Sequence, residues 1–371
     1  MKTFKELGVT DDLIKGLAEL GIVKPTEIQE KSIPFLLENG GDLIAQAQTG
    51  TGKTAAFGLP LLMGIKPDFN EIQAVVVSPT RELAKQIGKQ LFRFTKHSKS
   101  KIFVEVLCGG DSIDKQVAAL QRPTHIIVVT PGRFVDLLKR KCLALSSVKH
   151  VVLDEADEML SMGFKKELLR IFDHTKGRKS TWLFSATIPD SIRTLAKDCM
   201  TGNPTILKID RSHVVNRDIS HKYVLCEADE KLQSIIDFLK RQKDNRGVIF
   251  CRTKDTTIMV AKKLTATGFS LDIIHGDLMQ SERDKVMRSF KKERTQLLVA
   301  TDVAARGIDV EGLSFVVHHQ LPEQTEYYTH RSGRTARAGK KGISIAFVNS
   351  KERPRIAKLE SELGLTFVET R

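Results

Sequence analysis

The segment VKHVVLDEADEML carries four carboxylates within five residues, at Asp154, Glu155, Asp157 and Glu158. The aliphatic run before them is typical of a strand that is covered on both faces. Like charges crowded at the end of such a strand repel one another unless a cation lies among them. For Asp157 and Glu158 alone, an acidic helix N-terminus favoured by the helix dipole is an adequate alternative. The whole segment predicts a site that pairs carboxylates with a cation.

A second segment, AQTGTGKT at residues 47–54, has the composition of a phosphate-binding loop, or P-loop. Its glycines allow backbone N–H groups to point at phosphate oxygens, while Lys53 can reach the outer phosphates and Thr54 can ligate Mg²⁺. The general pattern begins with Gly, whereas this chain has Ala47. The alternative is a chance Gly-Lys-Thr in a turn, and the flanking strand DLIAQA and helical pattern AAFGLPLL argue against it. We therefore expect a nucleoside triphosphate site.

The two segments can serve a single site. In open α/β sheets, ligands bind beyond the carboxyl ends of the strands, which is where both segments would lie. Asp154 could then hold the Mg²⁺ that the phosphates and Lys53 share. Glu155 would be placed to orient and deprotonate the attacking water. The arrangement predicts hydrolysis of a nucleoside triphosphate.

A third segment, HRSGRTARAGKKG at residues 330–342, spaces three arginines three residues apart: Arg331, Arg334 and Arg337. On one helical turn this spacing would stack the guanidinium groups along one side. Such cations could reach the γ-phosphate as negative charge develops there. The alternative is a basic solvated turn. Because the arginines lie in the half without the P-loop, a shared site would require two domains to close.

Strands that could position these segments recur along the whole chain. The aliphatic runs are DLIAQA, AVVVSPT, HIIVVTP, VVLDE, TWLFSAT, GVIFCRT, QLLVATD, SFVVHHQ and ISIAFVN. Helical patterns lie between them: RELAKQIGKQLFRF, GRFVDLLKR, ADEKLQSIIDFLKRQ and TTIMVAKKLTATG. This alternation predicts an α/β fold with mostly parallel sheets flanked by helices.

The two halves of the chain also resemble each other. VVVSPTRELAKQ parallels VIFCRTKDTTIM, and IIVVTPGR parallels LLVATDVAARG. A length of 371 residues favours two domains. The polar stretch at 208–223, KIDRSHVVNRDISHKY, is the best candidate for the hinge. We expect an N-terminal domain at 1–208, a short linker at 209–218 and a C-terminal domain at 219–371.

The amino-acid composition limits the classes of molecule that the chain is expected to bind. The net charge is +14, with +7 in residues 1–208 (30 Lys and Arg against 23 Asp and Glu) and +7 in the remainder. This favours a polyanion such as nucleic acid. One Trp and three Tyr leave few platforms for base stacking, so contacts should fall on the phosphate backbone. Short apolar runs, no secretory h-region and five scattered cysteines predict a cytoplasmic protein without a membrane partner.

In these segments and their order, the chain resembles the DEAD-box ATP-dependent RNA helicases of superfamily 2, which have two RecA-like domains. DEAD itself is residues 154–157, the resemblance covers nearly the whole chain, and Ala in the first P-loop position is normal in that family. It implies ATP and Mg²⁺ as cofactors, RNA as partner, a monomeric core, and the catalytic residues Lys53, Asp154, Glu155, Arg334 and Arg337.

The resemblance implies binding roles for further residues. Nucleotide binding falls to Phe4, Pro25 and Gln29 at the adenine, Gln48, Thr49, Gly50, Thr51, Gly52, Lys53 and Thr54 at the phosphates, Gly307 and Asp309 near the ribose, and Arg334 and Arg337 as arginine fingers. Mg²⁺ falls to Thr54 and Asp154. RNA binding falls to Pro79, Thr80, Arg81, Gly109, Gly110, Thr130, Gly132, Arg133, Arg252, Thr253, Gln280, Arg283 and Thr301.

Coupling of hydrolysis to strand separation is implied for Asp157, Ser185, Thr187, His330 and Arg331. Ser332 and Ala336 depart from the commoner Ile and Gly, and neither change removes a charge. Some of these signals are weak alone, since Gly109-Gly110 resembles an ordinary turn and a glutamine on a helix, such as Gln29, is usually solvated. Cys251 has the context of a small core residue rather than of a nucleophile.

Two alternatives to an RNA helicase remain open at this point. One is a DNA helicase of the same broad superfamily, because phosphate contacts hardly distinguish DNA from RNA unless the 2′-OH is bound. The other is an ATP-gated RNA clamp that does not require turnover. The intact Glu155 and the two arginines Arg334 and Arg337 argue against the clamp.

Overall fold

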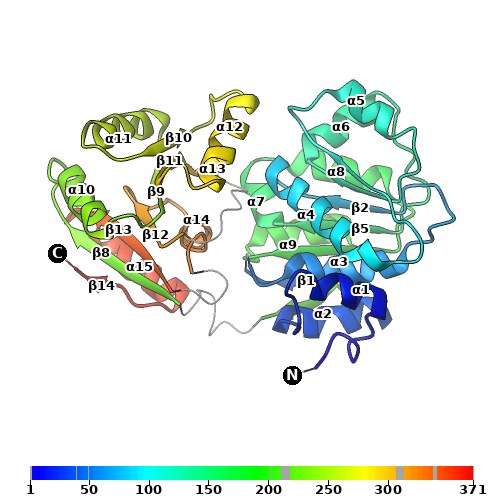
Figure 1. The fold of residues 1–371 in the computed structure, drawn as a ribbon. Coiled ribbons are helices and arrows are strands. Elements are labelled where there is room, and N and C mark those ends of the chain that lie inside the picture. Colours follow the sequence, from blue (N-terminus) through cyan, green and yellow to red (C-terminus); the bar gives the residue numbers. More distant parts are fainter. Residues whose placement is uncertain are drawn as a thin grey trace. The chain divides into compact units, whose positions relative to one another are not determined.

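In the computed structural model, the predicted aliphatic runs form inner strands of two parallel sheets (Figure 1). The structure describes residues 2–38, 40–48, 50–200, 202–209, 218–305, 313–336 and 341–370. Contacts divide the chain into two units, Met1–Ile209 and Asp210–Arg371. The domain and linker bounds proposed from the sequence remain predictions. Within the described ranges, every helix is too short or too polar to cross a membrane.

The first unit has, in its described residues, a seven-stranded sheet of order β3-β4-β2-β5-β6-β1-β7, with every neighbouring pair parallel. Aliphatic side chains at almost every position suit strands that are buried on both faces, as in the centre of this sheet. The strands are β1 Leu43–Gln46, β2 Ala74–Val77, β3 Val104–Leu107, β4 Ile126–Val129, β5 His150–Asp154, β6 Ser180–Ser185 and β7 Thr205–Lys208.

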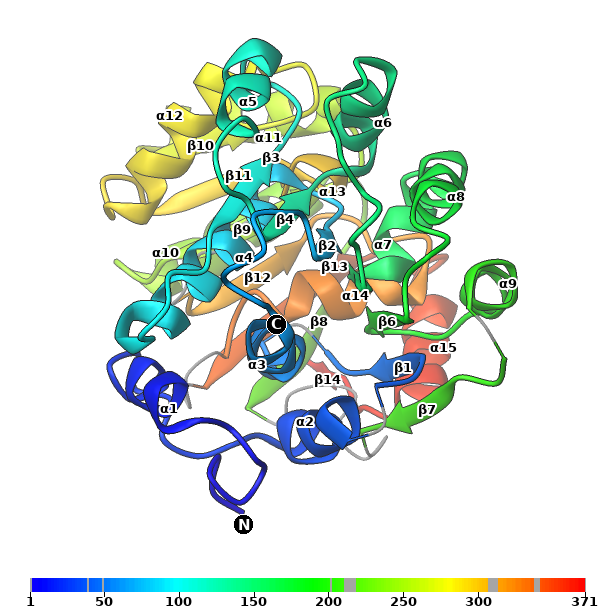
Figure 2. The same ribbon diagram turned by 90° about the vertical axis from the view of Figure 1, so that its right-hand side faces the viewer.

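Helices cover both faces of this sheet, each sealing one hydrophobic core. Helices on the first face are α1 Asp11–Ala18, α2 Glu27–Glu38, α3 Lys53–Gly64 and α4 Arg81–Phe94. The second face carries α6 Pro131–Lys139, α7 Ala156–Ser161, α8 Lys165–His174 and α9 Asp190–Cys199. The connections also contain the 3-10 helix η1 Thr95–His97 and the helix α5 Ile113–Ala119. In Figure 2, α2 and α3 are seen beside β1.

The second unit repeats this architecture. Its sheet, again among described residues, has the order β10-β11-β9-β12-β13-β8-β14 and is parallel throughout. The strands are β8 Ile219–Leu225, β9 Gly247–Cys251, β10 Leu271–Ile274, β11 Leu297–Thr301, β12 Phe315–His318, β13 Gly342–Val348 and β14 Val368–Glu369. The helices are α10 Lys231–Gln242, α11 Lys254–Ala266, α12 Gln280–Lys291, α13 Asp302–Ala305, α14 Thr325–Ser332 and α15 Arg353–Leu363.

The strand orders of the two sheets are the same when β8 to β14 replace β1 to β7 in turn. The predicted correspondence between the halves is therefore confirmed: VVVSPT and VIFCRT form β2 and β9, and IIVVTP and LLVATD form β4 and β11. The predicted α/β class, with two units that each have a parallel sheet flanked by helices, is also confirmed. The last residues of the expected hinge, 219–223, instead begin β8, which pairs with β13 and β14.

Candidate functional site

Three sequence segments that we expected to act together follow three adjacent strands. β6 pairs with β5 on one side and β1 on the other, so the loops after β5, β6 and β1 leave the same edge of the sheet. The P-loop follows β1, the segment 185–187 begins at the last residue of β6, and the four carboxylates begin at the last residue of β5. Parallel pairing thus assembles one site from segments far apart in the sequence.

The P-loop has the backbone conformation that a phosphate cradle requires. Gly50 and Gly52 have φ of 86° and 89°, in the left-handed region that favours glycine. Helix α3 starts at Lys53, so its N-terminal dipole faces the loop and favours an anion there. Thr54 lies in the first turn of α3, while Thr49 lies outside the described residues.

The predicted adenine-binding residues lie against this loop or in the nearby core. Gln29 is 2% exposed, accepts a hydrogen bond from Thr26 N (3.0 Å) and donates one to Gly52 O (2.9 Å). Thr26 Oγ1 also donates to Thr51 O (2.7 Å). Gln29 is therefore not solvated, and α2 is tied to the P-loop. Phe4 is buried in the core between helices, and Pro25 is also buried.

The cation expected among the carboxylates is Lys53. Its Nζ lies 3.7 Å from Asp154 Oδ1, and both side chains are buried. Burial raises the pKa of Asp154 to about 6, while the Lys53 ammonium acts to lower it. Within the described part of the chain, Lys53 Nζ has no hydrogen-bond partner. A buried ammonium with unused donors above a left-handed loop fits the phosphates of a nucleotide.

Glu155 has an unusual backbone. Its φ and ψ are 54° and 53°, so a bulky residue occupies the left-handed region at the start of α7. This conformation costs about 1–2 kcal/mol and is found where function demands a fixed direction. The Glu155 side chain is buried, and its N–H donates to Asp154 Oδ1 (3.1 Å). The backbone of Glu155 therefore helps to hold the Asp154 carboxylate.

The donors present fit Mg²⁺, although no described group of three or more His, Cys, Asp or Glu side chains could hold a metal by itself. Mg²⁺ commonly takes only one or two carboxylates from the protein and completes its octahedron with phosphate oxygens and waters. Asp154 and the hydroxyl of Thr54, at the ends of β5 and the P-loop, are donors of this kind.

Asp157 joins the carboxylate segment to the end of β6. Its N–H donates to Ser185 Oγ (3.2 Å), and its Oδ2 accepts from both the N–H and the hydroxyl of Thr187 (2.9 Å each). Asp157 and Ser185 are buried. A helix-dipole role alone does not account for these three bonds. They give Asp157 a fixed partner in the segment Ser185-Ala186-Thr187.

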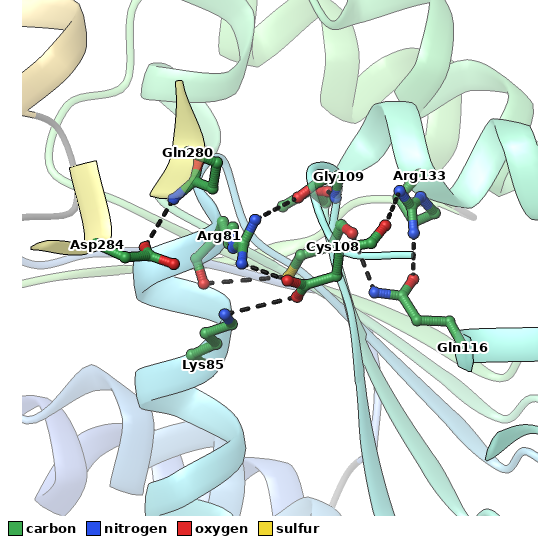
Figure 3. Close-up of polar contacts among 10 residues, drawn as sticks. Arg81, Lys85, Cys108, Gly109, Gln116, Arg133, Gln280 and Asp284 are labelled. Carbon is green, nitrogen blue, oxygen red and sulfur yellow. Dashed lines mark hydrogen bonds and ion pairs between the residues drawn. The ribbon is translucent and has the colours of Figure 1, made fainter. Parts of the chain in front are cut away.

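The predicted RNA-binding residues of the first unit form a bonded cluster (Figure 3). Arg81 bonds Gly109 O (3.2 Å) and the carboxylate of Asp111, which also pairs with Lys85 (3.5 Å). Gly110 has φ of 80°, as the turn requires. Sequence reasoning missed Asp111, although a carboxylate directly after Gly109-Gly110 in a basic region was a usable signal.

A second arginine fixes the same loop from its other side. Arg133 is 8% exposed and donates to Gln116 Oε1 (2.6 Å) and Asp111 O (2.9 Å). Gln116 Nε2 in turn donates to Cys108 O (3.0 Å), and Thr130 Oγ1 accepts from Gly109 N (3.3 Å). Pro79 and Thr80 lead into α4, where Thr80 caps the helix, and Gly132 lies in the first turn of α6. Gln116 is a second residue that the sequence did not reveal.

The predicted RNA-binding residues of the second unit lie at the corresponding strand ends. Arg252 and Thr253 follow β9, and the Thr253 hydroxyl caps α11. Thr301 ends β11, and Arg283 of α12 donates to the O atom of Ala304 just beyond it (3.0 Å). Gln280 Nε2 donates to Asp284 Oδ1 (2.9 Å), as Figure 3 shows.

The arginine segment departs from the sequence prediction. Helix α14 ends at Ser332, so Arg331 and Arg334 do not lie along one side of a helix, and this part of the prediction is wrong. Gly333 terminates the helix before the arginine spacing is complete. Arg334 Nε donates to His330 O (3.2 Å). Arg337, Gly307 and Asp309 lie outside the described residues.

Arg331 is a buried side chain with several polar partners, and its role in coupling remains a prediction. It is 2% exposed, forms a two-pronged ion pair with Asp302 (2.5 and 2.6 Å) and donates to Gln320 O (2.8 Å). Its Nη1 lies 3.3 Å from His318 Nδ1, and burial holds the pKa of His318 well below its usual value. Cys251 is fully buried in the core of the second unit, as predicted, and this burial raises the pKa of its thiol to about 12.

A P-loop, a lysine–aspartate pair and two RecA-like units define a nucleoside triphosphatase of the helicase type. The family model described as DEAD/DEAH box helicase matches residues 26–195, and the helicase conserved C-terminal domain matches 230–339. The chain is 42% identical over 360 residues to the DEAD-box ATP-dependent RNA helicase CshA of Bacillus cereus, covering 97% of this chain and 68% of the relative. RhpA of Helicobacter pylori, with the same description, is 40% identical over 361 residues, covering 97% and 72%.

Solved structures agree with this assignment. Dbp5 of S. cerevisiae bound to RNA and ADP BeF3 has a TM-score of 0.91 and 34% identity, covering 100% of this chain and 96% of that chain. Mss116p bound to ssRNA and AMP-PNP has a TM-score of 0.89 and 29% identity, covering 100% and 80%. The chain belongs to the family of DEAD-box ATP-dependent RNA helicases.

Proposed function

We propose that this chain hydrolyses ATP when RNA is bound and uses the cycle to open short stretches of RNA duplex. The observation that carries the proposal is the buried Lys53–Asp154 pair at 3.7 Å, assembled beside the left-handed P-loop glycines. Lys53 would bind the outer phosphates, and Thr54 and Asp154 would hold Mg²⁺. When bound, Mg²⁺ offsets the charge on the phosphate oxygens. Glu155 would take the proton from the attacking water.

RNA would bind the loops after β2, β3 and β4, and the corresponding strand ends of the second unit. Arg81 and Arg133 are engaged with the loop at 108–111, so we propose that they hold its backbone in position while the loop and helix ends meet RNA phosphates. Closure of the two units on ATP and RNA would bring Arg334 and Arg337 to the γ-phosphate. Reopening after hydrolysis would release the strand.

The test of this proposal is the ATPase rate of the full chain with single-stranded RNA, with single-stranded DNA of equal length, and without nucleic acid. We expect stimulation by RNA and little by DNA, together with ATP-dependent separation of a short RNA duplex. Equal stimulation by DNA would favour a DNA helicase. Stable RNA retention without hydrolysis would favour a clamp. The names of the relatives and the RNA in the Dbp5 and Mss116p structures favour the RNA enzyme.

We propose that the contact between Asp157 and Thr187 links ATP hydrolysis to separation of the RNA strands. Replacing Thr187 with valine should leave ATP hydrolysis nearly intact but reduce duplex separation per ATP by about tenfold or more, since bonds to charged groups contribute about 1.5–3 kcal/mol. Thr194→Val, which removes an exposed hydroxyl that donates to Asp190 O one turn earlier in α9, is the control. Equal loss of both activities would show that Thr187 supports the site itself.

The monomeric core and the cytoplasmic location remain predictions.

A further inference from the structure

Positive charge is concentrated in one short segment that the proposed site does not use. Residues 83–104 contain six Lys and Arg and no Asp or Glu, out of a net charge of +14 for the whole chain. All six side chains are exposed: Lys85, Lys89, Arg93, Lys96, Lys99 and Lys101. The segment comprises most of α4, then η1 and the start of β3.

Packing of α4 aligns part of this charge. The helix buries Ala84, Ile87, Gly88, Leu91 and Phe94, and a Cβ on Gly88 would meet Val106 of β3 at 2.4 Å. Its opposite face presents positions 85, 89, 92 and 93. These are spaced as i, i+4, i+7 and i+8, which places them in one stripe along the helix. At a rise of about 1.5 Å per residue, positions 85 to 93 extend over about 12 Å of this helix.

Acidic neighbours neutralise only part of the segment. Glu19 pairs with Lys96 (2.6 Å) and with His97 (2.7 Å), and Asp111 pairs with Lys85 (3.5 Å). In the ranges that the structure describes, no ion pair involves the four remaining cations, Lys89, Arg93, Lys99 and Lys101. The stripe therefore retains a positive field that a polyanion would meet.

An aromatic ring stands in the same stripe. Phe92 is 70% exposed between Lys89 and Arg93, and Phe103, directly before β3, is 41% exposed. A core role does not explain rings that are open to solvent. An exposed ring among cations is the combination with which proteins hold single-stranded nucleic acid, because the ring stacks on a base while the cations meet phosphates. The low Trp and Tyr content had suggested that such platforms were scarce.

We propose that this α4 surface, defined by Lys89, Phe92 and Arg93, binds single-stranded RNA where the strand extends beyond the central site. It rests on the proposed function, because α4 begins at Arg81 in a proposed RNA-binding loop. Lys85, one turn further along, shares Asp111 with Arg81. The stripe thus continues directly from that loop. An acidic protein would also meet the charge, but the exposed ring and this continuity favour RNA.

The test compares the full chain with Lys89→Ala/Arg93→Ala on single-stranded RNAs of increasing length, in the presence of a non-hydrolysable ATP analogue. The wild type should bind longer RNA more tightly, and the variant should lose most of that gain. The slope of log affinity against log salt for long RNA should fall by about 1.4, since each phosphate contact contributes about 0.7. Phe92→Ala should lower the affinity for long RNA by about fivefold or more.

A matched control removes two exposed lysines elsewhere, Lys262→Ala/Lys263→Ala on α11, and should leave both slope and length dependence unchanged. For the shortest RNA that stimulates ATP hydrolysis, the α4 variants should have the same affinity and the same ATPase rate as the wild type. Wild-type affinity for long RNA in Lys89→Ala/Arg93→Ala would overturn this inference, whatever else that surface binds. Failure of RNA to stimulate even the wild type would instead overturn the proposed function.

Discussion

Replacing Glu155 with glutamine should lower the ATPase turnover number by about 10²- to 10⁴-fold, the range that general acid–base catalysis contributes. An amide cannot accept the proton of the attacking water, while its size and shape match the carboxylate. The backbone at Glu155, with φ of 54°, already carries its strain in the wild type, so glutamine adds little. Single-turnover hydrolysis with saturating RNA is the measurement.

Binding must be measured with the same protein. ATP and RNA affinities of Glu155→Gln should stay close to those of the wild type, because Lys53, Thr54 and the RNA-binding loops are unchanged. Glu38→Gln, an exposed glutamate at the end of α2, is the matched control and should hydrolyse ATP normally. Normal turnover in Glu155→Gln would remove Glu155 from the role of base. Loss of ATP binding would point instead to damage of the turn at Asp154.

Replacing Arg331 with alanine should lower the free energy of unfolding of the second unit by about 3–5 kcal/mol, the cost of breaking a buried ion pair by removing one partner. The variant would leave Asp302 without its two-pronged partner and Gln320 O without its donor. It would also remove a contact of the buried His318, whose Nε2 bonds Ser344 Oγ (3.0 Å). Hydrogen exchange of β11 and β12 reports on this unit.

An exposed ion pair of the same unit provides the comparison. Lys254 pairs with Asp277, but both side chains are largely solvated, so Lys254→Ala should leave the free energy of unfolding nearly unchanged. If Arg331→Ala proved as stable as Lys254→Ala, the buried network would not support the fold as argued. Because Arg331 directly follows His330 and precedes Arg334, loss of this support should also lower RNA-stimulated ATP hydrolysis.

Several features of this protein were determined by its sequence alone. The central strands are near-continuous aliphatic runs, which can be recognised from a few consecutive residues. GTGKT and DEAD lie at the ends of two of these runs. The correspondence between the halves also followed from local pattern. Edge and mixed strands were missed. β3 and β10 are only partly buried, and ISHKYVL of β8 is interrupted by polar residues, so none of these three strands has the run of apolar residues that a central strand shows.

Only the tertiary structure decided which partners the chemical groups have. Lys53 and Asp154 are 101 positions apart in the sequence, yet lie 3.7 Å apart because β1 and β5 flank β6. In the same way, Asp157 accepts a hydrogen bond from Thr187, and Asp111 forms an ion pair with Arg81. Helix α14 ends between Arg331 and Arg334. Spacing along a chain fixes only near neighbours, whereas these contacts depend on strand order, on where each helix stops and on which charges become buried.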